Sequence, residues 1–569
     1  MHSQNQKTIV IWGAGRIGRG FIADLFYSAG YRLVFIDESA SLVDQLCKAG
    51  QYAIVRAPDA STRQDITIHP YLVLHTSQSS QIEQVVLETD LMAVALYPRS
   101  FPQAAGQMSA CLEKRFKTGK KNPLNILVCT NLSDAAAVFS AELEKALSTP
   151  VFDALRPFLG IIDTVIIRFA SESQVDDPLL VWTNGYSELP VNFRAFKGDI
   201  PDVNFFRLVN DMPNEEMRKL YTYNMLHTLL AYHGYQHQCQ VLRDCLEIEN
   251  IRKEGRDALQ ESSQVLQKAA GFSREDMEIW NAQVWEQTSS PVLGGPVIRM
   301  GGEPLRKLAR RDRLVGPALL ARQHGIPNQH LVKGIAAGFH FNPSQDTEAK
   351  DIQNRILDLG IRRTVEDVCQ LSGDEQDLRD QIVLAYHRYP LELHWQENAR
   401  KAYWLAFDYE KKYRGCGQCV VASLLETMDG FDEQVFASAT GLSGGVGNAG
   451  DATCSAYLGS VLVFGMLFPR RRIHFDGDRE NKYRTFHMAQ KQRLNFLNEY
   501  GSITCQDIHR HKYGRSFNLI DPSQRQPFED AGAHGDFGCT LVTAKAARWA
   551  AEIIAEEMIE DQLKNLEES

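Results

Sequence analysis

Hydrophobic positions in the first 200 residues come in short runs separated by segments of helical periodicity. The runs are TIVIW (8–12), RLVFI (32–36), LMAVALY (91–97) and NILVCT (125–130), and all are rich in residues that favour strands. Short buried runs that alternate with helices are typical of a parallel sheet covered by helices on both faces. The pattern predicts a doubly wound α/β domain over residues 1–204.

Beyond residue 204 the pattern becomes mainly helical. Few strand-like runs occur between 205 and 390, and the segments 245–270 and 348–370 have the length and periodicity of long helices. Pro390, in YHRYPLELHW, is expected to stop a helix because proline lacks the N–H group that the helix interior requires. We therefore predict a helical domain over 205–390 and a third, mainly α-helical and cysteine-rich domain over 391–569.

Charge and composition narrow the classes of function. The net charge of −10 and the pI near 5.9 disfavour binding to nucleic acid or to anionic membranes. The longest apolar run, AYLGSVLVFGMLF (456–468), is shorter than the ~20 residues of a membrane-spanning helix. The start MHSQNQKTIVIWGAG has no apolar signal region, so we expect a cytoplasmic protein with no nucleic-acid or membrane partner.

The first strand leads into a glycine-rich turn, IVIWGAGRIGRGF, with the pattern Gly13-x-Gly15-x-x-Gly18. This pattern between a strand and a helix predicts a Rossmann-type dinucleotide site, with the pyrophosphate at the helix N-terminus. Asp37 ends the second strand at the distance expected for an acid that binds the ribose 2′-hydroxyl, which favours NAD over NADP. The predicted cofactor-binding residues are Gly13, Gly15, Arg16, Ile17, Gly18 and Asp37.

A helix predicted over RKLYTYNMLHTLLAYHGY (218–235) carries three polar residues in the pattern K-x4-N-x2-H. At about 100° per residue, Asn224 lies about 140° round from Lys219, and His227 lies between them at about 80°. The spacing by itself fits either a solvated polar face or a site that holds a substrate oxygen and moves its proton. A lysine serves as a general base when burial and neighbours bring its pKa towards ~7–8.

Several of these segments together resemble the polyol-specific long-chain dehydrogenases, most closely the mannitol-1-phosphate 5-dehydrogenases. The resemblance covers about residues 8–390 and includes GAGRIGRGF, FKGDIP (196–201), the helix just described, EPLRKLARRDRL (303–314) and GIAAGFHF (334–341). It implies an NAD-dependent enzyme, monomeric or homodimeric, without a catalytic metal. By resemblance, Lys219 is the general acid/base and Asn224, His227 and Asn131 bind the reacting oxygen.

Two segments bear on the substrate. The family usually reads V-D-R-I where this chain has TVIIRFA, so that Ile167 stands where an acid is expected and Arg168 is retained. The basic segment PLRKLARRDRL would place Arg306, Arg310 and Arg313 on one face if it is helical, and such a face suits a phosphate. The alternative is a solvated basic face. The predicted phosphate-binding residues are Arg306, Lys307 and Arg310.

The last third of the chain contains Cys416, Cys419, Cys454, Cys505 and Cys539. Their segments resemble the redox-active module named for its C-GCAxxC-type cysteine pattern, although the Cys416-x-x-Cys419 spacing departs from that family. A C-x-x-C pair at a helix start favours a reactive dithiol, and gathered thiolates can also hold a soft metal or an iron–sulfur cluster. The third reading is that these cysteines are small buried apolar residues.

The sequence thus predicts an NAD-dependent dehydrogenase fused to a cysteine-rich, redox-active module. Its substrate pair is a sugar alcohol and the corresponding ketose, with or without a phosphate group. The competing hypothesis is a non-catalytic NAD(H)-binding redox sensor or electron-transfer protein that works through the cysteines. The complete Lys219, Asn224 and His227 set favours the enzyme, whereas Ile167 favours the sensor.

Overall fold

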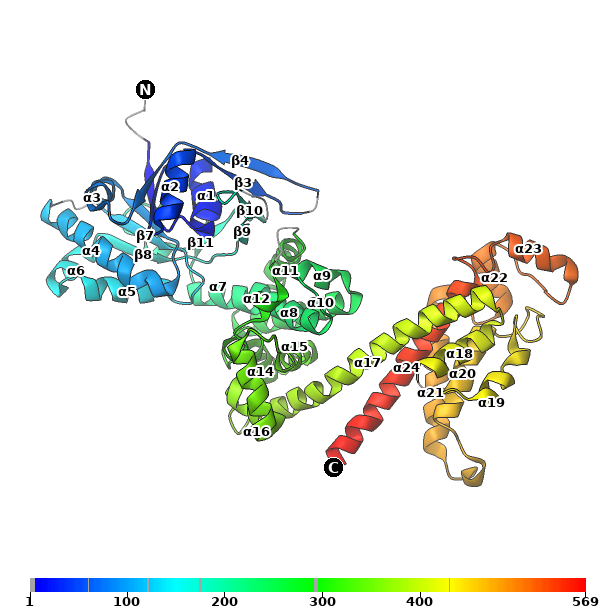
Figure 1. Cartoon of the computed structure of the whole chain (residues 1–569). Helices are drawn as coiled ribbons and strands as arrows, with labels where there is room; N and C mark the ends of the chain where they lie inside the picture. Colours follow the sequence, from blue (N-terminus) through cyan, green and yellow to red (C-terminus); the bar gives the residue numbers. More distant parts are fainter. Residues whose placement is uncertain are drawn as a thin grey trace. The chain divides into compact units, whose positions relative to one another are not determined.

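A computed structural model describes residues 6–59, 61–119, 122–172, 177–290, 295–428 and 430–568 (Figure 1). The chain forms two compact units, Met1–Val383 and Leu384–Ser569. Within the described part, none of the helices combines the length and apolar character needed to cross a membrane.

The predicted α/β domain opens unit 1 and is built on a six-stranded parallel sheet. The strand order is β5-β2-β1-β6-β7-β8, in which β1 pairs with β2 on one side and with β6 on the other. The order reverses at β1, so the carboxyl ends of β1 and β6 flank the point where nucleotides bind in sheets of this kind. The strands are β1 (Thr8–Trp12), β2 (Arg32–Asp37), β5 (Tyr71–His75), β6 (Leu91–Val94), β7 (Leu124–Val128) and β8 (Leu159–Asp163).

Alternate residues of these strands fill two separate cores. Ile9 and Ile11 of β1 pack on one face with the first helices, whereas Val10 and Trp12 pack on the other. Because successive side chains of a strand point to opposite faces, a run such as TIVIW must be apolar throughout when helices cover both faces. One face carries α1 (Ala23–Ser28) and α2 (Ala40–Ala49); the other carries α3 (Ser79–Glu88), α4 (Phe101–Lys117), α5 (Ala135–Ala146) and α6 (Thr149–Leu155) (Figure 1).

Two smaller sheets complete this part of unit 1. A four-stranded sheet has the order β4-β3-β10-β9, and β11 pairs with β12 in parallel. The strands are β3 (Tyr52–Arg56), β4 (Gln64–Ile68), β9 (Ala170–Glu172), β10 (Val181–Thr183), β11 (Leu189–Asn192) and β12 (Phe206–Val209).

Helices make up the remainder of unit 1, as predicted. The two long helical segments expected from periodicity correspond to α10 (Glu249–Ala269) and α16 (Thr347–Cys369), the second of which is kinked at Gly360, where φ is +78°. The others are α7 (Met212–Lys219), α8 (Met225–Gln236), α9 (Leu242–Glu247), α11 (Arg274–Thr288), α12 (Val297–Gly301), α13 (Pro304–Lys307), α14 (Val315–His324) and α15 (Gln329–Phe339).

The expectation that Pro390 stops a helix is wrong. The helix α17 runs from Gln376 to Lys412 with Pro390 in its interior. A proline there costs one hydrogen bond of the helix ladder, but apolar residues on both sides are packed. Ile382 is fully buried before it, and Leu391 packs against the Ile559 cluster after it. Tertiary packing therefore outweighs the local cost.

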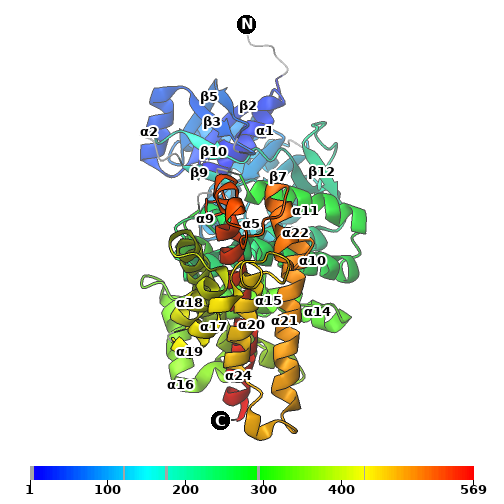
Figure 2. The same ribbon diagram turned by 90° about the vertical axis from the view of Figure 1, so that its right-hand side faces the viewer.

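The secondary-structure elements of unit 2, among its described residues, are all helices. Helices α18 (Cys416–Thr427), α20 (Ser455–Leu467), α21 (Arg479–Tyr500) and α24 (Cys539–Glu568) pack together around one hydrophobic core (Figure 2). The shorter helices are α19 (Glu433–Ser438), α22 (Cys505–Tyr513) and α23 (Arg525–Asp530). The mainly α-helical character predicted for residues 391–569 is confirmed.

Candidate active site

The glycine-rich turn has the geometry that a dinucleotide requires. Gly13 adopts φ +101°, and a Cβ there would collide with the Ala95 carbonyl oxygen. A Cβ on Gly18 would collide with the carbonyl oxygen of Gly13, so this glycine sets the close packing of the helix on the turn. A Cβ on Gly15, by contrast, would meet nothing within 4 Å. The backbone at Gly15 is therefore open to a ligand, and the first helical turn at Arg16 and Ile17 is half-buried beside it.

Asp37 closes the other side of this turn. Its Oδ2 atom accepts a hydrogen bond from the Ala14 N–H at 2.7 Å, and its Oδ1 atom accepts one from the Ser39 N–H at 2.9 Å. These bonds hold a half-buried carboxylate at the end of β2, directly beside the glycines. A carboxylate in this place accepts a ribose hydroxyl and repels a 2′-phosphate. The residues present therefore fit NAD.

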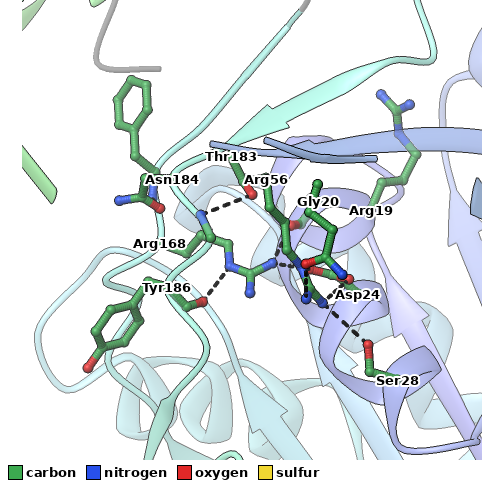
Figure 3. Close-up of polar contacts among 12 residues, drawn as sticks. Arg19, Gly20, Asp24, Ser28, Arg56, Arg168, Thr183, Asn184 and Tyr186 are labelled. Carbon is green, nitrogen blue, oxygen red and sulfur yellow. Dashed lines mark hydrogen bonds and ion pairs between the residues drawn. The ribbon is translucent and has the colours of Figure 1, made fainter. Parts of the chain in front are cut away.

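A buried ionic cluster fixes the helix that follows the glycine turn (Figure 3). Asp24 is fully buried in α1 and accepts from the guanidinium groups of both Arg56 and Arg168. Arg168 also donates to the Gly20 carbonyl at 2.9 Å and to the Tyr186 carbonyl at 2.6 Å. Burial lowers the pKa of Arg168 to about 10, which leaves it charged. Arg168, the arginine retained in TVIIRFA, therefore links the segment around Asp24 to the segment around Tyr186.

The helix that carries Lys219, Asn224 and His227 is not a regular α-helix. Between α7 and α8 the chain forms one π-helical turn, η4 (Leu220–Asn224). The i→i+5 bonds of such a turn accommodate one more residue than an α-helical turn, so residues five apart lie more nearly above one another. Lys219 and Asn224 therefore share a face more closely than the 140° expected from the sequence.

Side chains of neighbouring helices accompany the irregular turn. The Ser262 hydroxyl of α10 donates to the Tyr221 carbonyl, and Trp280 Nε1 of α11 donates to Thr222 Oγ1 at 2.9 Å. Ser262 and Thr222 are fully buried. Turns of this kind occur often at functional sites, and the sequence pattern contains no signal that predicts one.

Lys219, Asn224 and His227 are half-buried on a helix whose other residues from Tyr221 to Leu230 are buried. A solvated polar face would leave them exposed, so the structure disfavours that reading. Lys219 Nζ donates to the Oδ1 atom of Asn131, which follows β7 at the carboxyl edge of the sheet. Two of the predicted residues are thus brought together from segments that are far apart in the sequence.

The environment of Lys219 lowers its pKa from 10.5 to about 7. Burial is the main cause, the positive charge of Arg313 adds to it, and the nearby carboxylate of Glu216 opposes it. The pKa of Glu216 is itself raised to about 7 by burial and by the charge of Asp163. Asp163 ends β8 and accepts from the Ala136 N–H of α5 at 2.6 Å. Sequence reasoning missed both the Glu216 carboxyl and the proximity of Arg313.

His227 is held in its neutral form. Burial, together with the positive charges of Arg313 and Lys219, lowers its pKa to about 4. Its Nε2 atom lies 3.3 Å from the hydroxyl oxygen of the buried Thr288, which orients the ring. A neutral, oriented imidazole can hydrogen-bond an oxygen without competing with Lys219 for the proton.

Ile167 is buried, with 7% of its surface exposed, and it brings no charge to this region. Asp163 and Glu216 do not replace the missing carboxylate, because neither forms an ion pair with Lys219. Asp163 is engaged with the start of α5, and Glu216 hydrogen-bonds the backbone N–H of Asp134 at 3.3 Å.

The basic segment does not form the single helix on which the predicted shared face depends. Only Pro304–Lys307 is helical, and a turn follows. Arg306 pairs with Glu303 at 2.7 Å, whereas Arg310 makes two bonds to Glu375 at 2.6 and 2.7 Å. Lys307 is buried and donates to the Met300 carbonyl at 2.8 Å. Arg306, Lys307 and Arg310 therefore bind different intramolecular partners. They do not form the shared face that helical spacing would give.

In unit 2 the five predicted cysteines separate into two groups. Cys416, Cys454, Cys505 and Cys539 line one cavity of about 360 Å³, and Cys419 is outside its lining. Cys419 instead donates to the Arg414 carbonyl at 3.4 Å. Burial raises the pKa of Cys454 to about 11 and that of Cys539 to about 12, so as free thiols they are protonated and weakly nucleophilic at neutral pH.

Comparison with protein-family models gives three matches that cover most of the chain. Residues 7–204 match the mannitol dehydrogenase Rossmann domain, and residues 212–385 match the mannitol dehydrogenase C-terminal domain. Residues 415–553 match the C_GCAxxG_C_C model, described as a putative redox-active protein. The resemblances identified from the sequence are confirmed in all three regions.

Solved structures confirm the fold of unit 1. A D-sorbitol dehydrogenase in substrate-free form aligns with a TM-score of 0.58 at 13% identity. A Pseudomonas fluorescens mannitol 2-dehydrogenase, in ternary complex with NAD and D-mannitol, aligns with a TM-score of 0.54 at 12% identity. Each alignment covers 67% of this chain and 92% of the other.

Proposed function

Since the chain belongs to the mannitol dehydrogenase family through residues 7–204 and 212–385, we propose that it interconverts a sugar alcohol and the corresponding ketose, with Lys219 as the acid/base. Membership of the family by itself indicates an NAD-dependent polyol dehydrogenase. The proposal adds the residues that move the proton and the class of substrate.

The observation that carries the proposal is the placement of Lys219. Its amine donates to Asn131, and its pKa is about 7, where a proton can be taken up and released near neutral pH. A general base is most effective when its pKa lies near the working pH. A lysine on a solvated surface would instead keep a pKa near 10.4.

The surrounding groups suit an alcohol whose oxygen becomes negatively charged. Because the Asn131 carbonyl oxygen accepts from Lys219, the Asn131 amide N–H groups remain to donate to a substrate oxygen. Neutral His227 and Asn224 lie on the same helix face and offer further donors to that oxygen. NAD, when bound, would supply the acceptor for the hydride that leaves the carbinol carbon. Lys219 removes the hydroxyl proton in the oxidation direction and returns it in the reduction direction.

We expect the preferred substrate to be unphosphorylated. Two of the cations predicted to bind phosphate are neutralised by carboxylates, Arg306 by Glu303 and Arg310 by Glu375, and Lys307 faces a backbone carbonyl. Arg313, which lies near Lys219, also pairs with Asp312 at 2.6 Å. The Arg306–Glu303 pair is exposed and contributes little, but at Arg310 and Arg313 a phosphate would leave a mostly buried carboxylate unpaired.

A substrate screen tests the proposal. NADH formation or consumption is followed with matched pairs, such as mannitol and mannitol 1-phosphate or fructose and fructose 6-phosphate, with the Lys219→Ala variant as control. Turnover of a free polyol that depends on Lys219 supports the proposal. A strong preference for the phosphorylated member of each pair would refute the substrate assignment and leave the acid/base assignment standing.

The sensor hypothesis makes the opposite prediction for the same experiment. A sensor binds NADH tightly, which tryptophan fluorescence quenching would detect, yet turns over no polyol or ketose of either series. The pKa of Lys219 and its contact with Asn131 favour the enzyme, because a protein that only binds NAD(H) has no need of a tuned base.

A further inference from the structure

The four cavity cysteines of unit 2 occupy equivalent positions on four helices. Cys416, Cys505 and Cys539 are the first residues of α18, α22 and α24, and Cys454 is the N-cap of α20. Four helix N-termini from separate parts of the sequence therefore meet at one cavity. Each of these helices is at least 9 residues long, and each directs the positive end of its dipole and its first N–H groups towards the cavity.

Close backbone contacts hold these ends together. A Cβ on Gly459 of α20 would lie 2.5 Å from the Gly417 carbonyl oxygen of α18. Gly445, in the loop before α20, has φ +72°, and a Cβ there would lie 2.6 Å from the Cβ of Cys505. The two helices and the loop can approach this closely only because these positions lack side chains. The shape of the cavity therefore depends on these glycines.

The cavity also contains buried polar atoms that have no partner among the described residues. His509, which is 2% exposed, has an unpaired Nδ1 atom. Glu410 is 3% exposed, and its carboxyl group contacts the Cys419 thiol but leaves the Oε2 atom unpaired. Both His509 and Glu410 line the cavity. Most buried polar atoms in folded proteins have hydrogen-bond partners, so two unpaired groups in one cavity mark it as a place for ordered water or a ligand.

Two of the four sulfur atoms lie beside one imidazole. His509 Nε2 lies 3.5 Å from Cys505 Sγ and 4.0 Å from Cys539 Sγ. The Tyr513 hydroxyl donates to Cys539 Sγ at 3.3 Å. Donors directed at sulfur are the outer contacts that tune metal–thiolate centres.

The spacing of the thiols distinguishes between kinds of metal centre. A single tetrahedral zinc ion holds thiolates about 2.3 Å from one point, which brings the sulfurs within roughly 4 Å of one another. In the described part of the chain, no set of three or more His, Cys, Asp or Glu side chains is close enough to hold one ion. The cysteines instead line, together with other residues, a cavity of about 360 Å³. An iron–sulfur cluster takes four thiolates and spreads them around several metal atoms.

From this arrangement we propose that the cavity binds an iron–sulfur cluster, with Cys416, Cys454, Cys505 and Cys539 as its ligands. Each thiol exchanges its S–H bond for an S–Fe bond and releases one proton to solvent. The assembled centre with its four thiolates is an anion, which the four helix N-termini stabilise. His509 and Tyr513 donate to its ligand sulfurs. Cys419 takes no part, because it lies one turn into α18 and its sulfur faces the Arg414 carbonyl.

Anaerobic reconstitution of the full chain tests this proposal. The protein is incubated with sulfide and equal amounts of ferrous and ferric iron, desalted, and analysed for iron, acid-labile sulfide, zinc and visible absorbance. We expect two to four irons per chain with matching sulfide, and an electron paramagnetic resonance signal in one of the two redox states. Changing any of the four ligand cysteines to serine should lower the iron content by more than half.

Cys419→Ser is the matched control, because it changes a buried cysteine of the same helix outside the cavity lining. It should retain the full iron and sulfide content. Circular dichroism and thermal melting of the full chain confirm that each variant folds. If a ligand variant misfolds, alkylation of the unmodified protein decides: the cluster should protect all four ligand cysteines, and its removal by a chelator should expose them together.

Three results would overturn the proposal. They are a reconstituted protein without iron and sulfide above background, one zinc ion per chain in their place, and loss of the centre in Cys419→Ser as complete as in Cys416→Ser.

Discussion

The pH dependence of alcohol oxidation is set by how far the fold lowers the pKa of Lys219. An unperturbed amine with a pKa of 10.5 is neutral in about one molecule in three thousand at pH 7. With a pKa of about 7, about half of the molecules carry the neutral amine that can accept a proton. Burial and Arg313 therefore increase the competent fraction about 10³-fold at neutral pH.

The sign of the dependence follows from the direction of the reaction. Oxidation needs the neutral amine, so kcat/KM should fall about tenfold for each pH unit below 7 and level off above it. Ketose reduction needs the ammonium form, so its rate should fall as the pH rises through the same pKa. Removing the positive charge with Arg313→Gln should move both profiles to higher pH, and removing the negative charge with Glu216→Gln should move them to lower pH.

The assay is initial-rate NADH absorbance between pH 5.5 and 9.5, with three variants that identify the titrating group. Lys219→Ala should lose the acid limb, meaning the fall in kcat/KM below pH 7. Its kcat should decrease ~10²–10⁴-fold. Lys307→Met should keep the limb, although burial lowers the pKa of that lysine to about 7 as well. His227→Asn should keep it too, because a pKa of about 4 places His227 outside this range. The reasoning fails if Lys219→Ala retains the limb, or if Lys307→Met abolishes it.

Three further predictions follow from other parts of unit 1. Asp37→Ser should narrow the preference for NADH over NADPH, measured by fluorescence titration, and equal affinities in the unmodified protein would contradict the role of Asp37. Asp24→Asn should lower the free energy of unfolding by ~3–5 kcal/mol because it leaves Arg168 charged and buried; a melting temperature within error of the parent would show that the cluster is not stabilising. A chain of residues 1–390 should still bind NADH, since the cofactor residues and their core lie within unit 1, and loss of binding in a folded truncation would refute this.

Much of the first domain could be predicted from the sequence, because local signals determine it. The run TIVIW is apolar at every position since both faces of β1 are covered, and the spacing of Gly13, Gly15 and Gly18 is set by one turn and one ligand. Asp37 follows at the end of the next strand. The glycine turn is local, and Asp37 follows within the same strand–helix–strand unit, so the pattern of this short segment is enough to predict them.

The catalytic helix and the basic segment show where local reasoning fails. The π-helical turn that ends at Asn224 receives a hydrogen bond from Ser262, which lies on a different helix. The basic segment has the spacing of a helix face, yet Glu375 and other distant partners draw its side chains apart. The α-helical pattern through Pro390 persists because both flanks are packed. In each case contacts between distant segments outweigh a local preference, which is below about 1 kcal/mol for most residues and about 3 kcal/mol for a proline inside a helix.

For the cysteines of unit 2, the spacing in the sequence and the grouping in space disagree. Cys416 and Cys419 are three residues apart, and their spacing alone suggests a dithiol. A cysteine at the first position of a helix lies beside N–H groups that no helical carbonyl satisfies, whereas one a turn further in lies beside a carbonyl. Cys416 meets the first condition, and Cys419, which donates to the Arg414 carbonyl, meets the second. Which thiols act together is therefore decided by where four helices begin, and those starting points are fixed only when the helices pack.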